Sequence, residues 1–231
     1  MKLLVIDTST SANSIAVTEN GRLLAELLVN PEATHSASLM SGLDIVLRSA
    51  GITAVGLDAI GVTRGPGSFT GLRVGIAAAK GLSLATGKPV VGFSSLAMLA
   101  MNLPHAHLPV CPMLDARKSE VYGALYRCDA LPTAIIEDSV AKPSVLLEKI
   151  KGDTLFVGSG ALRYRDLIVE ALGDRAHFAP SVIHQPRASA GALLAADLLE
   201  RGEVIPASEL IPVYLRLSEA ELARKAQETT W

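Results

Sequence analysis

The chain begins with an uninterrupted apolar run at residues 3–6, which is typical of a strand buried on both faces. Two more apolar segments follow, at residues 14–18 and 23–29. The Glu-Asn-Gly sequence at 19–21 separates them, and Asn-Gly favours the positive φ angles of a hairpin turn. The pattern therefore predicts a meander of three strands at the start of the chain.

Helical spacing follows at residues 36–50, and Gly51 stands where a helix commonly ends. One face of this segment is apolar and consists of Leu39, Leu43, Val46 and Leu47. A strand is predicted at residues 59–63 and another at 90–93. Between them, a helix follows the loop at 65–67 and ends at about residue 86. The first part of the chain therefore has the order β-β-β-α-β-α.

The same order of elements appears a second time. The later elements are strands at 110–114, 120–127, 133–137 and 154–157 and helices at 94–102, 144–150, 161–172 and 188–201. Asp7 ends the first strand of one copy, and Asp115 ends the first strand of the other. We therefore expect a duplicated α/β fold with lobes at residues 1–103 and 104–204, and a tail at 205–231 that can pack back on the first lobe.

The turn after the first strand is a candidate phosphate site. Asp7, Thr8 and Ser9 follow the buried strand, and a carboxylate with hydroxyls at this place could hold a hydrated metal ion and phosphates. Such a turn normally contains a glycine, so that the backbone can approach the phosphate closely, and none is present here. In the alternative interpretation, which we favour, these side chains bond to neighbouring N–H groups.

A second candidate anion site precedes the helix that ends near residue 86. Gly65, Gly67 and Gly71 permit a compact loop, and either Ser68 or Thr70 can cap the helix. The N-terminus of a helix attracts anions. However, the spacing differs from that of a P-loop, no lysine lies in the loop, and G-x-G-x-x-G does not occur after the first strand. The residues alone therefore give a weak signal for phosphate.

The helix after this loop has no continuous polar face, so we expect both of its sides to be covered. The preceding helix also has apolar residues, Met40 and Ile45, away from its main face. Two neighbouring helices with surplus apolar surface indicate a protein interface. The alternative is a helix enclosed within one subunit. The residues predicted for the interface are Leu39, Leu43, Val46, Leu47, Val74, Ile76, Ala78 and Leu82.

Composition limits the classes of function. The chain has 231 residues, of which 49% are hydrophobic and 19% charged, so a packed core is expected. The formal net charge of −2 gives no broad attraction to a polyanion, so contact with nucleic acid should be local or made through a partner. The start of the chain forms a strand instead of a signal peptide, and no apolar run is long enough for a bilayer. We therefore expect a cytoplasmic protein without membrane contact.

Catalytic and metal-binding patterns are weak. None of the five histidines has a histidine partner four residues away. His105 and His107 lie in a proline-flanked connector, where they could bind a metal or simply face solvent. The charged turn that follows Asp115 is either a site or a solvated hairpin end. Cys111 and Cys128 lie far apart and are expected as buried thiols in a reducing compartment. The sequence therefore predicts no catalytic residues and no metal ligands.

Four segments together resemble the bacterial TsaB (YeaZ) family of tRNA threonylcarbamoyladenosine biosynthesis proteins. They are LLVIDTST, GPGSFTGLRVGIAAAKGL, DARKSEVYGALY and PVYLR, at residues 3–10, 65–82, 115–126 and 212–216. The resemblance implies the actin-like, sugar-kinase-like ATPase (ASKHA) fold, in which two related lobes each contain a mixed sheet flanked by helices. It also places Gly158 and Gly160 where the adenosine loop of that fold would lie.

The resemblance implies a role as a non-catalytic, stabilising subunit. Its complex adds a threonylcarbamoyl group to the adenine next to the anticodon of tRNAs that read ANN codons. The implied partners are the catalytic paralogue TsaD, the small ATPase TsaE and, when the protein is alone, a second copy bound through the same helices. Contact with tRNA would be indirect. No cofactor would be bound tightly, and ATP or ADP would bind weakly at the interface of the complex.

Two differences from the catalytic paralogue support a non-catalytic role for this chain. The paralogue carries a His-x-x-x-His metal pair after its fifth strand, whereas residues 90–100 here contain no histidine. A zinc or iron site cannot form on that helix without these imidazoles. The missing glycine at residues 7–10 likewise opposes independent ATP hydrolysis. The alternative functions are a stand-alone ATP-dependent small-molecule kinase of the same fold and, less compatible with the missing histidines, a metalloprotease.

Overall fold

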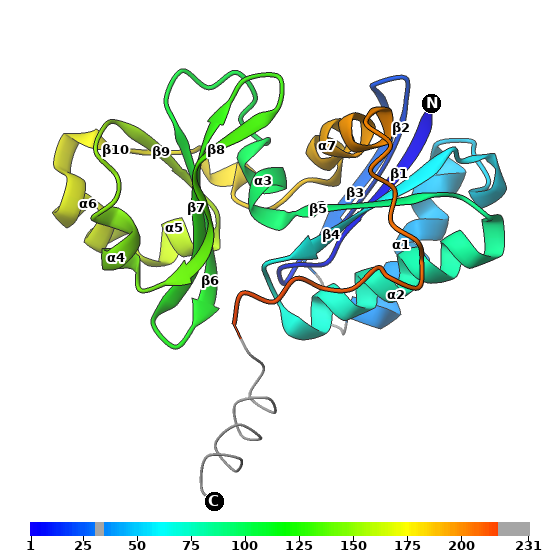
Figure 1. The fold of residues 1–231 in the computed structure, drawn as a ribbon, viewed down its shortest axis with the longest axis horizontal. Coiled ribbons are helices and arrows are strands. Elements are labelled where there is room, and N and C mark those ends of the chain that lie inside the picture. Colours follow the sequence, from blue (N-terminus) through cyan, green and yellow to red (C-terminus); the bar gives the residue numbers. More distant parts are fainter. Residues whose placement is uncertain (31–34, 217–231) are drawn as a thin grey trace, which may run out of the picture.

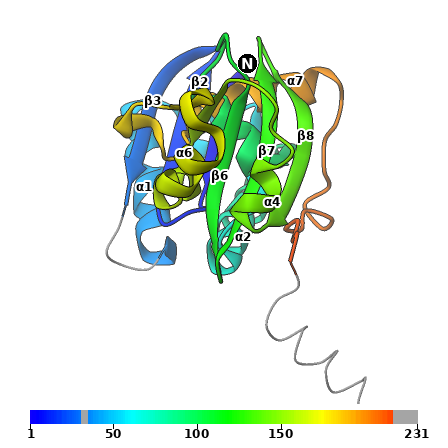
Figure 2. The same cartoon turned by 90° about the vertical axis from the view of Figure 1, so that its left-hand side faces the viewer.

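A computed structural model describes residues 1–30 and 35–216 of the chain, and it has two sheets side by side, each flanked by helices (Figure 1). Figure 2 views the same molecule from the side of the second sheet. The first sheet contains β1 to β5 in the order β3-β2-β1-β4-β5. Its strands are β1 (Lys2–Asp7), β2 (Asn13–Glu19), β3 (Arg22–Val29), β4 (Ala59–Gly65) and β5 (Val90–Ser94).

The second sheet repeats this topology. Its order is β10-β9-β6-β7-β8, and its strands are β6 (Val110–Arg117), β7 (Glu120–Cys128), β8 (Pro132–Ala141), β9 (Thr154–Val157) and β10 (Ala176–Phe178). In each sheet the first strand is central, an antiparallel meander extends to one side, and two parallel strands extend to the other. The predicted duplication of the α/β unit is therefore confirmed.

The helices cover both faces of the first sheet. These helices are α1 (His35–Ser49), α2 (Phe69–Thr86), α3 (Ser95–Ala100) and α7 (Ala188–Glu200), whereas α4 (Pro143–Leu147), α5 (Ser159–Arg163) and α6 (Arg165–Leu172) pack on the second sheet. Leu4 and Ile6 of β1 belong to a core with α1 and α2. Leu3 and Val5 point to the other face and belong to a core with α3 and α7. This alternation follows from the two-residue repeat of a strand, and it explains why the run at 3–6 is wholly apolar.

One core connects the two lobes. The cluster that contains Leu3 and Val5 also contains Val110, Leu114 and Val157 of the second sheet. Its centre is α3, which is buried at every one of its positions. Another core fills the outer side of the second sheet between β6, β9 and the helices α4 and α6. The lobes are therefore joined through apolar packing on the side where α3 and α7 lie (Figure 1).

The structure differs from the predicted elements in two places. The helix expected at 161–172 is interrupted at Tyr164, whose φ of −107° and ψ of 24° separate α5 from α6. The strand β10 was not expected, because three residues with a central histidine carry no periodic signal. Short elements of this kind form because a neighbouring edge is available, here that of β9.

Helix α7 and the residues directly after it pack on the first lobe. Helix α7, which the sequence groups with residues 104–204, contacts the strands of the first sheet. After it, the Ile205 N–H donates to the carbonyl of Val90 at 2.8 Å, beside the edge strand β5. The amphipathic pattern of a helix does not indicate which sheet the helix will cover. The lobe boundaries near residues 103 and 204 stay a prediction. Within the described residues, no helix combines the length and apolarity needed to cross a membrane.

Candidate functional site

The turn after β1 is closed by its own hydrogen bonds. The Ser9 N–H donates to Oδ1 of Asp7 at 3.1 Å, and the Thr63 hydroxyl donates to the same oxygen at 2.6 Å. The Thr8 hydroxyl donates to the carbonyl of Gly71 at 2.7 Å. Asp7, Thr8 and Ser9 are at most 2% exposed. The bond from the Ser9 N–H to Asp7 is of the kind expected if these side chains bond to neighbouring N–H groups. The Thr8 hydroxyl instead bonds to a carbonyl of α2, that of Gly71.

The glycine-rich loop lies directly on this turn. The Ser68 N–H donates to the Ser9 carbonyl at 2.7 Å. A Cβ atom added to Gly67 would lie 2.3 Å from that same oxygen, and one added to Gly71 would lie 2.0 Å from the Thr8 carbonyl oxygen. The first turn of α2 thus packs directly against backbone atoms of residues 8–9. These glycines are required by that close contact.

The start of α2 is also capped by the protein itself. The Ser68 hydroxyl accepts from the Gly71 N–H at 3.2 Å, as its position before the helix predicts. The Gly65–Pro66 peptide is cis, and Gly65 has a φ of 130°. A Cβ on Gly65 would lie 2.5 Å from the Val213 carbonyl oxygen, so the far end of the chain covers this side of the loop.

The second lobe repeats this arrangement. The Asp115 carboxylate accepts from the Arg117 N–H at 3.0 Å, just as Asp7 accepts from the N–H two residues later. A Cβ on Gly158 would lie 2.2 Å from the Met113 carbonyl oxygen, and one on Gly160 would lie 3.0 Å from it. Both glycines therefore allow the start of α5 to pack on β6. The duplication extends from the sheets to the turns at the end of their central strands.

The turn after Asp115 is more exposed and more charged than its counterpart. Asp115 forms an ion pair with Arg163 at 2.8 Å. Arg117, Lys118 and Ser119 all have positive φ angles and exposed side chains. Nucleotide binding at these turns, by Asp7, Thr8, Ser9, Gly65, Gly67, Ser68, Gly158 and Gly160, stays a prediction.

The residues predicted for a protein interface divide into two groups. Leu39, Leu43, Val46 and Ile76 are 1–4% exposed and lie in the chain's own core. Leu47, Val74, Ala78 and Leu82 are partly buried at the edge of that core. The first group cannot meet a partner without repacking the lobe, because these side chains already contact the sheet. Helical periodicity identified the apolar side of α1 but not its direction.

Other apolar side chains of these helices face solvent. Met40 and Ile45 of α1 are 58% and 53% exposed, and Leu84 of α2 is 79% exposed. The sequence indicated the exposure of Met40 and Ile45, because both lie away from the main apolar stripe of the helix. The sequence did not indicate the exposure of Leu84, because α2 is apolar on most sides. Leu47, Val74, Ala78 and Leu82 of the same helices are half-buried. We refer to the exposed Met40, Ile45 and Leu84 together with these four residues as the α1–α2 face.

The described histidines have structural or exposed positions. Nδ1 of buried His184 accepts from the Gly158 N–H at 3.0 Å, so Nε2 carries the proton that bonds to the Ala179 carbonyl at 3.0 Å. His105 and His107 are exposed and line a hollow of about 390 Å³ with Arg127 and Asp129. Across residues 1–30 and 35–216, no three His, Cys, Asp or Glu side chains gather to hold a metal ion.

A polar cluster between the lobes was not foreseen from the sequence. Asp138 of β8 accepts from the hydroxyls of Ser94 and Tyr126, each at 2.5 Å. Ser94 also caps α3 by accepting from two backbone N–H groups. Burial raises the pKa of Asp138, and these two hydrogen bonds oppose the rise in part. Burial first, and then the Asp138 charge, raise the pKa of Tyr126. The cluster therefore favours protonated, uncharged groups.

The two cysteines are buried, as the sequence predicted. Burial raises the pKa of Cys111, and burial together with the charge of Asp129 raises the pKa of Cys128 to about 12. Both thiols therefore remain protonated at neutral pH and lack the thiolate that a nucleophile needs.

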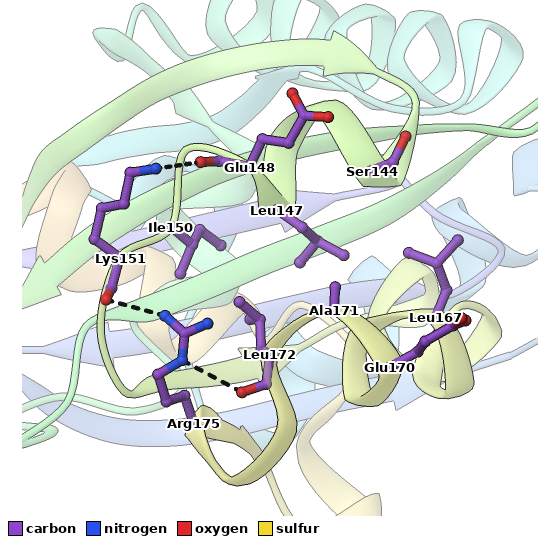
Figure 3. Close-up of a pocket in the computed structure, with 10 residues that line it drawn as sticks. All are labelled: Ser144, Leu147, Glu148, Ile150, Lys151, Leu167, Glu170, Ala171, Leu172 and Arg175. Carbon is purple, nitrogen blue, oxygen red and sulfur yellow. Dashed lines mark hydrogen bonds between the residues drawn. The ribbon is translucent and has the colours of Figure 1, made fainter.

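A further hollow lies on the outer side of the second lobe, between α4 and α6 (Figure 3). Its volume is about 510 Å³, and its lining residues are Ser144, Leu147, Glu148, Ile150, Lys151, Leu167, Glu170, Ala171, Leu172 and Arg175. Nζ of Lys151 donates to the Glu148 carbonyl at 2.7 Å, and Arg175 donates to the Lys151 carbonyl at 3.1 Å. The basic groups therefore bond to the wall of the hollow itself, and it lies apart from the candidate loops.

Comparison with known proteins gives consistent relatives. The family described as TsaD, tRNA N6-adenosine threonylcarbamoyltransferase, matches residues 29–224. The tRNA threonylcarbamoyladenosine biosynthesis protein TsaB of Bacillus subtilis is 32% identical over 225 residues, which are 96% of each chain. The structure of YeaZ from Pseudomonas aeruginosa superposes with a TM-score of 0.79 at 32% identity, over 93% of this chain and 99% of that one.

A more distant likeness concerns the fold alone. A ROK hexokinase from Thermus thermophilus superposes with a TM-score of 0.52 at 15% identity, over 87% of this chain and 100% of that one. Together with the two related lobes, this likeness confirms the predicted actin-like, sugar-kinase-like architecture.

Proposed function

The chain belongs to the TsaB (YeaZ) family, and from this premise we propose that it is a non-catalytic, stabilising subunit in tRNA threonylcarbamoyladenosine biosynthesis. In this role it binds the catalytic paralogue TsaD, which adds a threonylcarbamoyl group to the adenine next to the anticodon of tRNAs that read ANN codons. The small ATPase TsaE joins the complex, and the protein works in the cytoplasm.

The α1–α2 face carries this proposal. Leu84, Met40 and Ile45 are each more than half exposed on two helices that contact each other. A large apolar side chain that leaves water on binding contributes about 1.5–3 kcal/mol, so several of them can drive association. The same face serves for a homodimer when TsaD is absent. This surface is the outward side of the two helices that the sequence identified.

The two candidate phosphate loops of the first lobe support a non-catalytic role. Backbone atoms of Thr8 and Ser9 occupy the space against Gly67 and Gly71. A phosphate would have to displace this contact before it could reach the first N–H groups of α2. Any ATP or ADP is therefore expected to bind weakly, where the partner completes the site. With a formal net charge of −2, the chain is expected to approach tRNA through its partner.

The test replaces exposed apolar residues of the α1–α2 face with a charge. Leu84→Glu and Met40→Glu should each reduce co-purification with TsaD at least tenfold, because an unpaired carboxylate in a desolvated contact costs several kcal/mol. Binding is measured by titration calorimetry and oligomeric state by light scattering. Both variants should unfold at the temperature of the parent chain, since the two positions are 79% and 58% exposed.

A matched control is available on another surface. Val182 is 78% exposed, so Val182→Glu introduces the same charge away from α1 and α2 and should leave TsaD binding unchanged. Unaltered binding by both Leu84→Glu and Met40→Glu would place the interface elsewhere. Leu43→Glu is unsuitable for this purpose, because Leu43 is 3% exposed and the variant would lose its core.

The competing function is a stand-alone ATP-dependent kinase, which the likeness to a hexokinase fold brings into consideration. The purified chain is expected to show no ATP turnover without TsaD and TsaE. Sustained hydrolysis by the chain alone that an Asp7→Asn variant abolishes would decide in favour of the kinase. Hydrolysis that this variant retains would come from a contaminating ATPase.

A further inference from the structure

The last described residues cross from the first lobe to the second. We call residues 211–216 the strap. The Val213 N–H donates to the Arg64 carbonyl at 2.7 Å, and Nε of Arg64 donates to the Ile211 carbonyl at 2.9 Å. The strap runs so close to Gly65 that a Cβ there would lie 2.5 Å from the Val213 carbonyl oxygen. Its first half is therefore fixed to the end of β4.

An aromatic and cationic stack holds the middle of the strap. The Tyr214 ring stacks on Phe69 with 4.7 Å between ring centroids. The Arg73 guanidinium lies 3.8 Å from the Phe69 ring centroid, and its Nε donates to the Tyr214 hydroxyl at 3.0 Å. Both contacts are favourable for aromatic rings. Tyr214 is thereby anchored to the first turns of α2.

The end of the strap reaches the other lobe. Nη1 of Arg216 lies 3.0 Å from Oε2 of Glu120, the first residue of β7. Glu120 directly follows the turn at residues 117–119, in which three successive residues have positive φ angles. The two side chains are 29% and 33% exposed. This ion pair joins a strap that is fixed to the first lobe to a hairpin of the second.

The strap and the shared core lie at opposite ends of the junction between the lobes. In Figure 1 the helices α3 and α7 lie in the upper part of the junction, and the red strap ends in its lower part near the β6–β7 hairpin. The apolar core contains buried residues of both sheets, and α3, which belongs to this core, lies in the short segment that connects β5 of the first sheet to β6 of the second. In the motion inferred here, α3 is the hinge. Rotation about it would separate Arg216 from Glu120.

We propose that the strap is a latch that sets the angle between the two lobes. The stack on α2 positions Arg216, and the pair with Glu120 closes the latch. Because the pair is about one-third exposed, it makes a modest contribution and can open and reclose. Three segments far apart in the sequence, at residues 64–73, 117–120 and 211–216, meet at this latch.

The test measures the distance between the lobes in the full chain without partners, so it does not depend on the proposed function. Val55→Cys and Lys149→Cys place nitroxide labels at exposed positions, one in each lobe. Cys111 and Cys128 are 0% exposed and stay unlabelled. Labelled chain is diluted with unlabelled chain, so that electron–electron resonance reports distances within one molecule.

The parent chain should give one narrow distance distribution. Arg216→Glu should shift part of the population to longer distances, with a change of about fivefold in the ratio of closed to open molecules. The exchanged pair Glu120→Arg with Arg216→Glu should restore the narrow distribution. Tyr214→Ala should also release the latch, because it removes the stack that positions Arg216.

Two results would overturn the latch. One is an unchanged distribution in both Arg216→Glu and Tyr214→Ala. The other is a distribution that stays broad in the exchanged pair, since the effect would then come from disturbed hairpin or tail structure. Asp44→Asn breaks the exposed pair with Arg48 within α1 and should leave the distribution unchanged. Thermal unfolding of each variant verifies that it is folded.

Discussion

Glycine has two different roles within α2. Gly71 is buried against the turn after β1, and a Cβ there would lie 2.0 Å from the Thr8 carbonyl oxygen. Gly81, ten residues later in the same helix, is exposed and has nothing within 4 Å of its Cβ position. The first glycine permits contact between backbones, whereas the second only lowers helix propensity. The sequence alone treats both as small residues of an apolar helix.

This difference predicts opposite effects of the same substitution. Gly71→Ala should lower the free energy of unfolding by about 3 kcal/mol, because the Thr8 backbone would have to move. Gly81→Ala should raise it by about 0.5–1 kcal/mol through improved helix propensity. Urea denaturation of both variants measures the two changes. Equal effects would mean that the contact beneath Gly71 is not tight.

At the scale of elements, α7 depends on Glu26 of β3. The Glu26 side chain is 6% exposed and pairs with Arg187 at 2.7 Å. Its other oxygen accepts from the N–H and the hydroxyl of Ser189, at 3.0 and 2.6 Å. The Ala188 N–H donates to the Ser14 hydroxyl at 2.7 Å. The first sheet therefore supplies the N-terminal cap of a helix that lies more than 150 residues later in the chain.

Removing this cap should loosen α7 from the sheet. Glu26→Ala is expected to lower the free energy of unfolding by about 1–2 kcal/mol, since it leaves the half-buried N–H and hydroxyl of Ser189 without their acceptor. Guanidinium denaturation gives the value. The comparison variant is Glu19→Ala on β2, whose pair with Lys2 at 3.6 Å is about 40% exposed and should contribute less than about 1 kcal/mol. Similar losses in the two variants would contradict the role of Glu26.

At the scale of the whole molecule, the lobes are joined by apolar packing and, besides the strap, by the polar cluster at Asp138. The core around α3 includes side chains of both sheets. Beside it, Asp138 of the second sheet bonds to Ser94, the residue that ends β5 and caps α3. Because burial raises the pKa of Asp138, its uncharged form fits this junction better than its carboxylate. We therefore expect the stability of the contact between the lobes to depend on pH.

The sign of this dependence follows from the direction of the shift. A carboxyl group whose pKa is higher in the folded than in the unfolded protein stabilises the fold most below its ordinary pKa of 3.8, and this contribution is lost as the pH rises through the folded value. Asp138→Asn stays neutral at every pH. The free energy of unfolding of Asp138→Asn relative to the parent should therefore increase from pH 4 to pH 7.

Urea denaturation at several pH values measures this difference. Asp174→Asn changes an exposed aspartate in a short helical turn and serves as the control for replacing one aspartate with asparagine. A flat difference for Asp138→Asn would mean that the carboxyl group titrates equally in the folded and unfolded chain.

Most of the elements were predictable because they are long and periodic. The run at residues 3–6, the Asn-Gly turn at 20–21 and the stripe of Leu39, Leu43 and Val46 each report a local preference. The repeated order of elements also predicted the duplicated sheets. The break at Tyr164 and the strand β10 could not be predicted, because they depend on neighbours distant in the sequence.

The candidate site was predictable only in part. The sequence identified the turn at Asp7 and the glycines at 65–71, but not that they fill one another's space. It identified α1 and α2 as apolar, but the structure decided that Leu43 is core and Leu84 is surface. Neither the Asp138 cluster nor the Arg216–Glu120 pair has a pattern that short-range reasoning can detect.

The sequence by itself determined the elements, the duplicated order and the membership of the chain in its family, because these depend on local periodicity and on motifs. The tertiary structure alone decided which side of α2 faces solvent, that α7 covers the first sheet, and that the strap meets the second lobe. The physical reason is that burial and ion pairing depend on which surfaces meet in space, and the chain brings such surfaces together from distant positions, 161 residues apart for Glu26 and Arg187.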